Sequence, residues 1–326
     1  MRSIRVLDGK TVDDIVESLP PEGMINLMER VFTQLVLATP ARISIPSDNH
    51  DVLFMPSRIS VAGGTGIKIV SVPKGKSADG LPATTLLMNE ETGSVEAMIN
   101  ARQLTAVRNV AGSALATKLA GVSDPRTIVF FGAGAQITQH ALLFLQLYPS
   151  VSRCYVVNRS INDRVEGLRK LINKRFSAVS IEAVLLEDSG KLKSSLENAD
   201  IVITATSSTK ALFDESWLNP SAHLNLIGSY TQEMREVTPA LIEQASLIIV
   251  DSLKDCQREA GDLAGTPAER MTELGSICGK GEVYKRAPGK FTVFKSVGVG
   301  VQDVAIARLV LRRAEEKGLG SMIPFD

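Results

Sequence analysis

Three cationic side chains stand in apolar stretches of the first third of the sequence: Arg42, Lys68 and Arg108. A cation in such surroundings is costly unless it is paired. A substrate carboxylate is a suitable partner, and arginine can bind it through two parallel hydrogen bonds. For each residue taken alone, a solvated side chain on an alternating strand is the competing interpretation. Together they favour a site for a small carboxylate.

A glycine-rich turn begins the second candidate site. It follows the apolar stretch 127–131 and precedes a helical pattern, which is the setting of a dinucleotide-binding turn. The first glycine allows a tight turn, the second lets the backbone approach a pyrophosphate, and the phosphate meets the helix N-terminus. The third place of the pattern is Ile137, so a plain strand–helix turn is the alternative. The residues predicted here to bind the cofactor are Gly132, Ala133, Gly134, Ala135 and Gln136.

The cofactor type depends on Asn158, Arg159 and Ser160, which end the next predicted strand. An acid at this point would bind the ribose 2′-hydroxyl of NAD(H), whereas an arginine can pair with a 2′-phosphate. We therefore predict NADP(H) in preference to NAD(H). The alternative is that Arg159 stacks on the adenine or stays solvated.

Small polar residues follow two further predicted strands. Thr206 and Ser207 come after one of them, and Gly228, Ser229 and Tyr230 after the next. The carboxyl ends of strands in such sheets line the ligand crevice. We expect all of them to reach the cofactor site.

The elements that must position these residues form two patterns. Residues 11–37 have helical periodicity broken at Pro20-Pro21, and five short strand patterns follow, which indicates an antiparallel α+β region. After a helix over 101–119, strands and helices alternate, which is typical of an α/β protein with a doubly wound, Rossmann-type parallel sheet. A final helix over 301–316 is expected to return to the first domain. We predict an α+β domain from residues 1–118 plus 303–326, and a Rossmann domain from residues 119–302.

The expected strands and helices of the second region can be given by range. The strands are 127–131, 154–157, 180–185, 201–205, 224–227 and 247–250, with 292–294 as a last strand. The helices are 135–147, 162–176 and 191–198.

Composition excludes several classes of function. The 36 basic and 36 acidic residues balance and form no basic cluster, so nucleic-acid binding is not expected. No apolar run is long enough to span a membrane and no apolar signal core opens the chain, so a cytoplasmic protein is expected. The three cysteines and three histidines show no spacing typical of a disulfide framework or a metal site. His140 and His223 are expected to be structural.

Taken together, these stretches resemble the ornithine cyclodeaminase/mu-crystallin family over nearly the whole chain. The matching stretches are 104–108, 131–136, 204–208, 223–228, 259–262 and 293–303. The resemblance implies a Rossmann domain plus a dimerisation domain built from both chain ends, a homodimer, and hydride transfer between NAD(P) and the α-carbon of an amino or imino acid.

The resemblance also implies roles for particular residues. Lys68 would manage the proton on nitrogen as well as bind the carboxylate with Arg42 and Arg108, and Ser296 and Val297 would lie beside the nicotinamide. Met55 is expected to line the substrate site. Thr84 and Arg108 are expected to contact the cofactor.

Two departures from the family pattern bear on the reaction. Cyclodeaminases carry a catalytic aspartate where this chain has Tyr230, and a glutamate where it has Leu53. Without these carboxylates, deamination of a diamino acid loses the groups that would move its protons. The preferred hypothesis is an NAD(P)H-dependent reductase of cyclic or N-substituted α-imino acids, in which Tyr230 assists Lys68. The alternatives are an ornithine or lysine cyclodeaminase or amino-acid dehydrogenase, and a protein that binds NADP(H) and a small carboxylate without turnover.

Overall fold

The computed structural model describes residues 3–34, 40–61, 63–74, 81–280, 283–285, 287 and 289–325. The chain divides into two compact units, called unit 1 (Met1–Ala111 and Gly298–Asp326) and unit 2 (Gly112–Val297). The sequence predicts divisions after residues 118 and 302, whereas the compact units divide after residues 111 and 297. The first division falls inside helix α3 (Leu104–Leu119), which the sequence predicts as one continuous helix.

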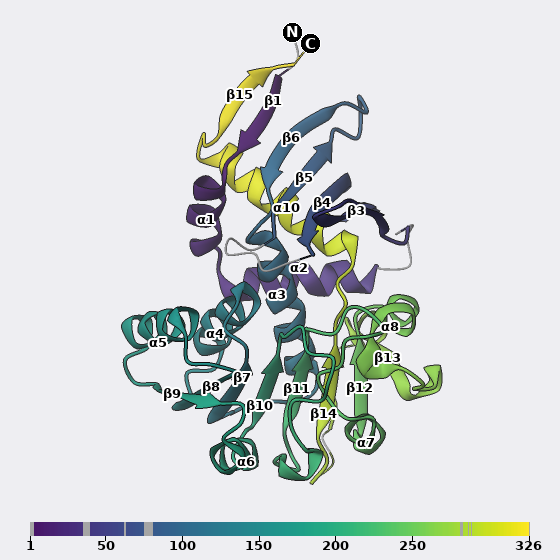
Figure 1. Cartoon of the computed structure of the whole chain (residues 1–326). Coiled ribbons are helices and arrows are strands. Elements are labelled where there is room, and N and C mark those ends of the chain that lie inside the picture. Colours follow the sequence, from purple (N-terminus) through teal and green to yellow (C-terminus); the bar gives the residue numbers. More distant parts are fainter. Residues whose placement is uncertain are drawn as a thin grey trace. The chain divides into compact units, whose positions relative to one another are not determined.

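Unit 1 contains a seven-stranded sheet in the order β15-β1-β6-β5-β4-β3-β2 (Figure 1). Its strands are β1 (Ser3–Leu7), β2 (Ile43–Pro46), β3 (His50–Ile59), β4 (Gly64–Pro73), β5 (Ala83–Met88), β6 (Val95–Asn100) and β15 (Ser321–Pro324). The antiparallel strands β2 to β6 agree with the prediction. The sequence did not predict β1 and β15, and the β1–β6 pair is parallel.

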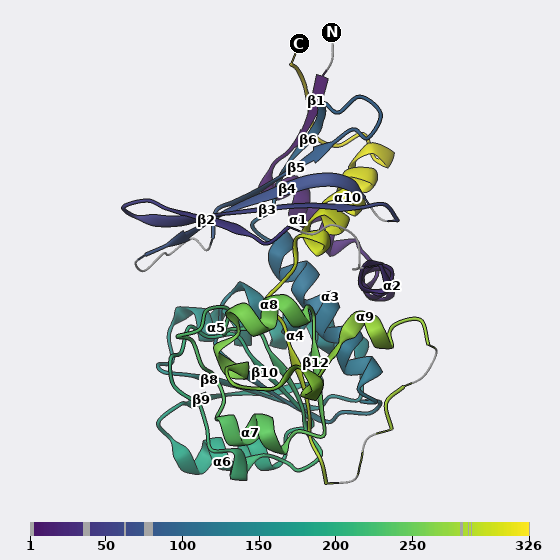
Figure 2. The same cartoon turned by 90° about the vertical axis from the view of Figure 1, so that its right-hand side faces the viewer.

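One long helix covers a face of this sheet. Figure 2 shows α10 (Gly300–Glu316) lying across the strands, and it contacts β3, β4, β5 and β6. Its buried side is rich in alanine and valine, which lets it approach closely. The helical pattern near the N-terminus forms two helices, α1 (Gly9–Glu17) and α2 (Pro21–Thr33), because proline at residues 20 and 21 interrupts the first. Residues 35–37 of the predicted helix lie outside the described residues.

Unit 2 contains an eight-stranded parallel sheet in the order β13-β12-β14-β11-β10-β7-β8-β9. Its strands are β7 (Thr127–Phe131), β8 (Arg153–Asn158), β9 (Ser180–Leu185), β10 (Ile201–Thr204), β11 (His223–Leu226), β12 (Leu247–Val250), β13 (Met271–Glu273) and β14 (Thr292–Lys295). This sheet confirms the predicted α/β fold with a Rossmann-type parallel sheet. The stretch expected as a last strand, β14, lies inside the sheet between β11 and β12.

Helices cover both faces of the parallel sheet, and Figure 2 shows α6 and α7 on one side and α4 on the other. The helices of unit 2 after α3 are α4 (Ala135–Leu147), α5 (Asp163–Arg175), α6 (Ser189–Glu197), α7 (Pro239–Gln244), α8 (Leu253–Glu259) and α9 (Leu274–Ile277). Strands β7, β10 and β12 are almost entirely apolar, as expected for strands covered on both faces. Among the described helices, none is both long enough and apolar enough to cross a membrane.

Candidate active site

The glycine turn has the geometry that the sequence predicts for a dinucleotide-binding turn. Gly132 follows β7 with φ 105°, a conformation that side chains disfavour, and a Cβ there would lie 3.2 Å from the Ala205 carbonyl oxygen. Gly134 caps α4, and a Cβ on it would meet no atom within 4 Å. Ile137, in the third place of the usual pattern, is fully buried. The turn therefore leaves an open approach to the helix N-terminus.

A cavity of about 250 Å³ lies at the carboxyl ends of β7, β8 and β10. These strands flank the point where the strand order reverses, which is where ligands bind in open α/β sheets. The lining includes six of the residues predicted to bind the cofactor: Gly132, Gly134, Asn158, Arg159, Thr206 and Ser207. Ala133, Ala135 and Gln136 belong to the same turn and to the first turn of α4.

The end of β8 contributes polar and cationic groups to this cavity. Asn158 donates to the Ser160 carbonyl oxygen at 2.9 Å, which shapes the turn between them. Arg159 and Arg164 line the cavity, and Arg164 stands in the first turn of α5. The sequence prediction missed Arg164. Its place in the first turn of the helix that follows the predicted ribose-binding residues is the signal that could have indicated it.

The residues that follow β11 belong to an internal hydrogen-bond network. Gly228 N donates to Glu236 Oε2 at 2.7 Å, and the fully buried Ser229 hydroxyl donates to the Met234 carbonyl oxygen at 2.7 Å. The cavity lining includes neither Gly228 nor Ser229. Tyr230 is half-buried against the hydrophobic core of unit 2. For Ser229 the structure thus indicates a structural role in place of the expected cofactor contact.

Ser296 and Val297 directly follow β14, at the carboxyl edge of the parallel sheet. The buried Ser296 hydroxyl donates to Asp251 Oδ2 at 2.7 Å, and Val297 packs in the core of unit 2. Because the hydroxyl proton is used by Asp251, Ser296 can offer only lone pairs to another group.

Two of the predicted cations of unit 1 meet on one carboxylate that the sequence prediction missed. Lys68 Nζ lies 2.8 Å from Asp303 Oδ2, and Arg108 Nε donates to Asp303 Oδ1 at 3.0 Å. Arg108 Nη1 also donates to Gln302 Oε1 at 3.1 Å and to Asn109 Oδ1. All these side chains are buried. Strand β4, helix α3 and helix α10 together position the cluster.

The charges in this cluster change the ionisation of its members. Burial lowers the pKa of Lys68 to about 8; Asp303 opposes this, and Arg108 and Arg42 lower the pKa further. Burial disfavours ionisation of Asp303, but Arg108 and Lys68 outweigh it and hold the pKa of that carboxyl below its usual value. Two cations therefore share one carboxylate while the charge of a third acts on Lys68, and the positive surplus suits an anionic ligand.

The sheet register decides which further residues share the Lys68 face. Met55 and Thr85 lie directly opposite Lys68 on β3 and β5. Thr84 points to the other face of the sheet, because neighbouring residues of a strand alternate. The structure thus brings Met55 to the cation cluster and does not bring Thr84 there. Thr85 lies on the Lys68 face instead. Its buried hydroxyl has no hydrogen-bond partner in the described part of the chain.

The histidines have the structural roles predicted for them. His140 is buried in α4 and bonds the Ser113 hydroxyl at 2.9 Å, and burial lowers its pKa to about 4. His223 is buried in β11 and bonds the Thr292 hydroxyl at 2.8 Å. Within the described residues, no group of three or more His, Cys, Asp or Glu side chains has an arrangement that would hold a metal ion.

Comparison with known proteins defines the class to which this fold and these residues belong. Residues 10–318 match the Ornithine cyclodeaminase/mu-crystallin family, so the chain belongs to that family. A Delta(1)-pyrroline-2-carboxylate reductase of Bacillus cereus is 27% identical over 299 residues, covering 88% of this chain and 89% of that protein. Ketimine reductase mu-crystallin of Rattus norvegicus is 29% identical over 277 residues, covering 83% of both.

The fold is also that of a solved relative. The Thermococcus litoralis Delta(1)-pyrroline-2-carboxylate reductase, determined in complex with NADH and L-proline, superimposes with a TM-score of 0.86 at 24% identity. The match covers 98% of this chain and 99% of that chain. The two-domain architecture of the family therefore extends over the whole protein.

Proposed function

We propose that this protein is an NAD(P)H-dependent reductase that converts cyclic or N-substituted α-imino acids to L-amino acids. The observation that carries the proposal is the cluster in which Lys68 and Arg108 share Asp303 and leave a surplus of positive charge. Such a cluster suits a substrate carboxylate, and a lysine of lowered pKa beside it suits proton donation to an imine nitrogen. The named activities of the Bacillus cereus and rat relatives are of this kind.

We propose NADP(H) as the preferred cofactor, with NAD(H) as the alternative. The open turn at Gly134 would take the pyrophosphate, and the cavity would take the adenosine end. Arg159 and Arg164 line that cavity, where an acid specific for NAD(H) would otherwise stand. When bound, the reduced nicotinamide would supply the hydride.

The side chains of unit 1 would bind and protonate the substrate. Arg108 and Arg42 would hold its carboxylate, and Lys68, which remains protonated below about pH 8, would donate a proton to the imine nitrogen. A protonated imine accepts a hydride more readily at its carbon, so holding that proton lowers the barrier. Met55 lies beside Lys68 and would contact the substrate side chain.

Ser296 and Val297 after β14 are proposed to have the roles that the family resemblance implies, and Tyr230 after β11 the role predicted for it from the sequence. We propose that Ser296 and Val297 border the nicotinamide, with Ser296 accepting a hydrogen bond because its own proton is held by Asp251. Tyr230 would assist Lys68 through its hydroxyl group.

We further propose that the protein is a homodimer. On the face of the unit 1 sheet that is turned away from α10, the register aligns Ile43, Phe54 and Ile69 in one row, and Leu86 beside Met98 in the next. Ile43 and Met98 are exposed in the single chain. Burial of such a contiguous apolar face against a second copy would remove it from water.

The experiment that tests the proposed function is NADPH oxidation with a panel of cyclic imino acids, pyrroline-2-carboxylate and piperideine-2-carboxylate included. We expect stoichiometric oxidation of NADPH and formation of the corresponding L-amino acid. Ammonia release from ornithine or lysine with a catalytic amount of NAD would favour the cyclodeaminase alternative. Tight NADPH binding without turnover on any imine or amine would favour a binding protein and overturn the enzymatic proposal.

A further inference from the structure

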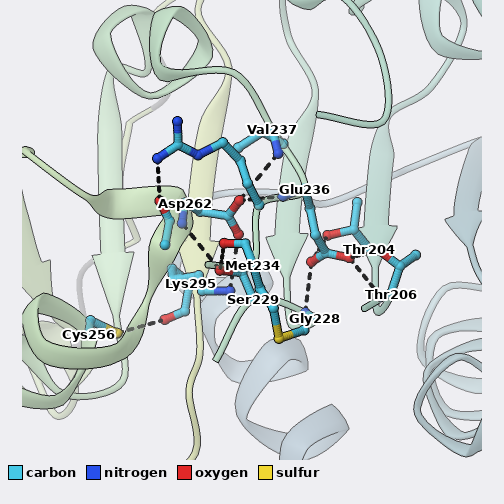
Figure 3. Close-up of polar contacts among 12 residues, drawn as sticks. Thr204, Thr206, Gly228, Ser229, Met234, Glu236, Val237, Cys256, Asp262 and Lys295 are labelled. Carbon is cyan, nitrogen blue, oxygen red and sulfur yellow. Dashed lines mark hydrogen bonds and ion pairs between the residues drawn. The ribbon is translucent and has the colours of Figure 1, made fainter. Parts of the chain in front are cut away.

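A buried carboxylate outside the expected site residues holds one wall of the dinucleotide cavity. Glu236 is fully buried, and each of its carboxylate oxygens accepts two hydrogen bonds (Figure 3). Oε1 accepts from Thr206 N at 2.7 Å and from the Thr206 hydroxyl at 2.8 Å. Oε2 accepts from the Thr204 hydroxyl and from Gly228 N, both at 2.7 Å. One side chain thus ties the carboxyl ends of β10 and β11 together.

The backbone beside Glu236 holds the same wall at two more points. Arg235 N donates to the Ser208 carbonyl oxygen at 2.7 Å, and Leu212 N donates to the Glu236 carbonyl oxygen at 2.8 Å. Thr206, Ser208 and Leu212 all line the cavity. Residues 235–236 are therefore a brace for the cavity loop 205–208.

The brace leaves one residue of that loop available to a ligand. The hydrogen-bonding groups of Thr206 point inward to Glu236, and Ser208 N donates to the Thr206 hydroxyl at 3.3 Å. Ser207, between them, lines the cavity and makes no hydrogen bond to any part of the chain that the structure describes. Its N–H and hydroxyl therefore remain available to a ligand in the cavity.

A second carboxylate holds Glu236 in turn. Asp262 Oδ1 accepts from Glu236 N at 2.6 Å and from Val237 N at 3.2 Å, and Asp262 Oδ2 lies 3.2 Å from Lys295 Nζ (Figure 3). Burial raises the pKa of Glu236, Lys295 on β14 counteracts this, and Asp262 adds to it. The four hydrogen bonds that Glu236 accepts offset part of the cost of burying this carboxyl group.

We propose that Glu236 is a positioning residue for the dinucleotide, whose carboxylate braces the cavity loop 205–208 so that Ser207 faces the cofactor. The inference rests on the proposed dinucleotide binding and adds the residue that preorganises it. A glutamine at this position retains one accepting oxygen but turns its NH₂ group toward two donors. The loop would then shift away from its binding geometry, for NADPH and NADH alike.

The test measures the dissociation constants of NADPH and NADH by fluorescence titration of the full-length protein. We expect Glu236→Gln to raise both constants by the same factor, about tenfold to a hundredfold, as for the loss of charge-assisted hydrogen bonds. The matched control is Glu233→Gln, the same change at an exposed residue three positions earlier, which should leave both constants unchanged. Thr204→Val removes one donor to Glu236 without altering the cavity lining and should raise both constants severalfold.

The outcomes separate this inference from the proposed function. If the wild-type protein binds neither cofactor, the proposed function fails and this inference fails with it. If the wild type binds and a folded Glu236→Gln variant has the same constants, only the role of Glu236 is overturned. A purely structural role would lower the unfolding temperature while leaving the constants of the folded variant unchanged. If the Glu236→Gln variant does not fold, the Thr204→Val variant provides the test. Unchanged dissociation constants of NADPH and NADH in that variant would overturn the inference.

Discussion

The two units each bury an ion-pair cluster, and the two clusters have opposite composition. In unit 1, Lys68 and Arg108 share the single carboxylate of Asp303. In unit 2, the single cation Lys295 pairs with Asp262, and its charge also acts on the carboxylate of Glu236. The first cluster has a positive surplus and can accept an anionic ligand. In the second cluster, backbone N–H groups and hydroxyl groups already donate to the carboxylate oxygens. That cluster holds loops in place.

This difference shows that a buried charge is informative only together with its partners. The carboxylates of unit 2 accept several hydrogen bonds each, so little of their binding capacity remains. The cations of unit 1 outnumber their carboxylate, and a substrate carboxylate would balance them. Under the proposed function, the cofactor phosphates would instead be bound in unit 2 by a glycine turn, a helix N-terminus and exposed arginines.

The largest effect is expected from removing the one carboxylate of the unit 1 cluster. Asp303→Asn leaves Lys68 and Arg108 buried without their counter-ion, and we expect a loss of about 3–5 kcal/mol in the free energy of unfolding. Urea denaturation of the full-length protein measures it. Asp14→Asn, in an exposed pair with Lys10, is the control and should scarcely change the midpoint. A midpoint equal to that of the control would contradict the role assigned to Asp303.

A smaller effect is expected in unit 2 from the arginine at the end of β8. Arg159→Ala should raise the dissociation constant of NADPH about tenfold and leave that of NADH nearly unchanged, because only NADPH carries the 2′-phosphate. Fluorescence titration with both cofactors measures the ratio. Arg153→Ala, an exposed arginine at the opposite end of the same strand, is the matched control. Equal loss of affinity for both cofactors would refute the NADP(H) preference.

The smallest effect is a shift in the pH dependence of kcat/KM. Burial lowers the pKa of Lys68 to about 8, so the lysine is protonated and able to donate below that pH and loses its proton above it. We expect kcat/KM for imine reduction to decline above about pH 8. In Lys68→Arg the guanidinium does not titrate in this range, so the decline should vanish from whatever activity remains. A decline that persists at the same pH in Lys68→Arg would assign it to another group.

Much of unit 2 could be predicted from the sequence because its signals are local. The predicted bounds of β7, α4, β9 and β12 agree with the structure. Apolar runs of strand length and the helical period depend only on neighbouring residues. The turn at Gly132 could be recognised for the same reason, since its conformation, its helix and its strand are contiguous in the chain.

The unit 1 cluster could be predicted only in part. Lys68 and Arg108 are recognisable as cations in apolar stretches, but Asp303 comes 195 residues after Arg108 and is still farther from Lys68 in the chain. Its lone acidic side chain in the apolar first turns of α10 was the signal that was available. The sequence predicts a cofactor contact for Thr84, and the register places Thr85 rather than Thr84 on the face of Lys68, because the direction of a strand side chain depends on its pairing.

The amino-acid sequence was sufficient to identify the family and to predict the two kinds of fold. It also indicated the types of side chain that could bind a dinucleotide and a carboxylate. These properties follow from residue type and short-range spacing. The tertiary structure alone decided that β14 lies between β11 and β12, that Asp303 pairs with Lys68 and Arg108, and that Glu236 braces the cavity loop. Strand order and buried ion pairs depend on contacts between segments far apart in the chain, and their geometry exists only once those segments have packed.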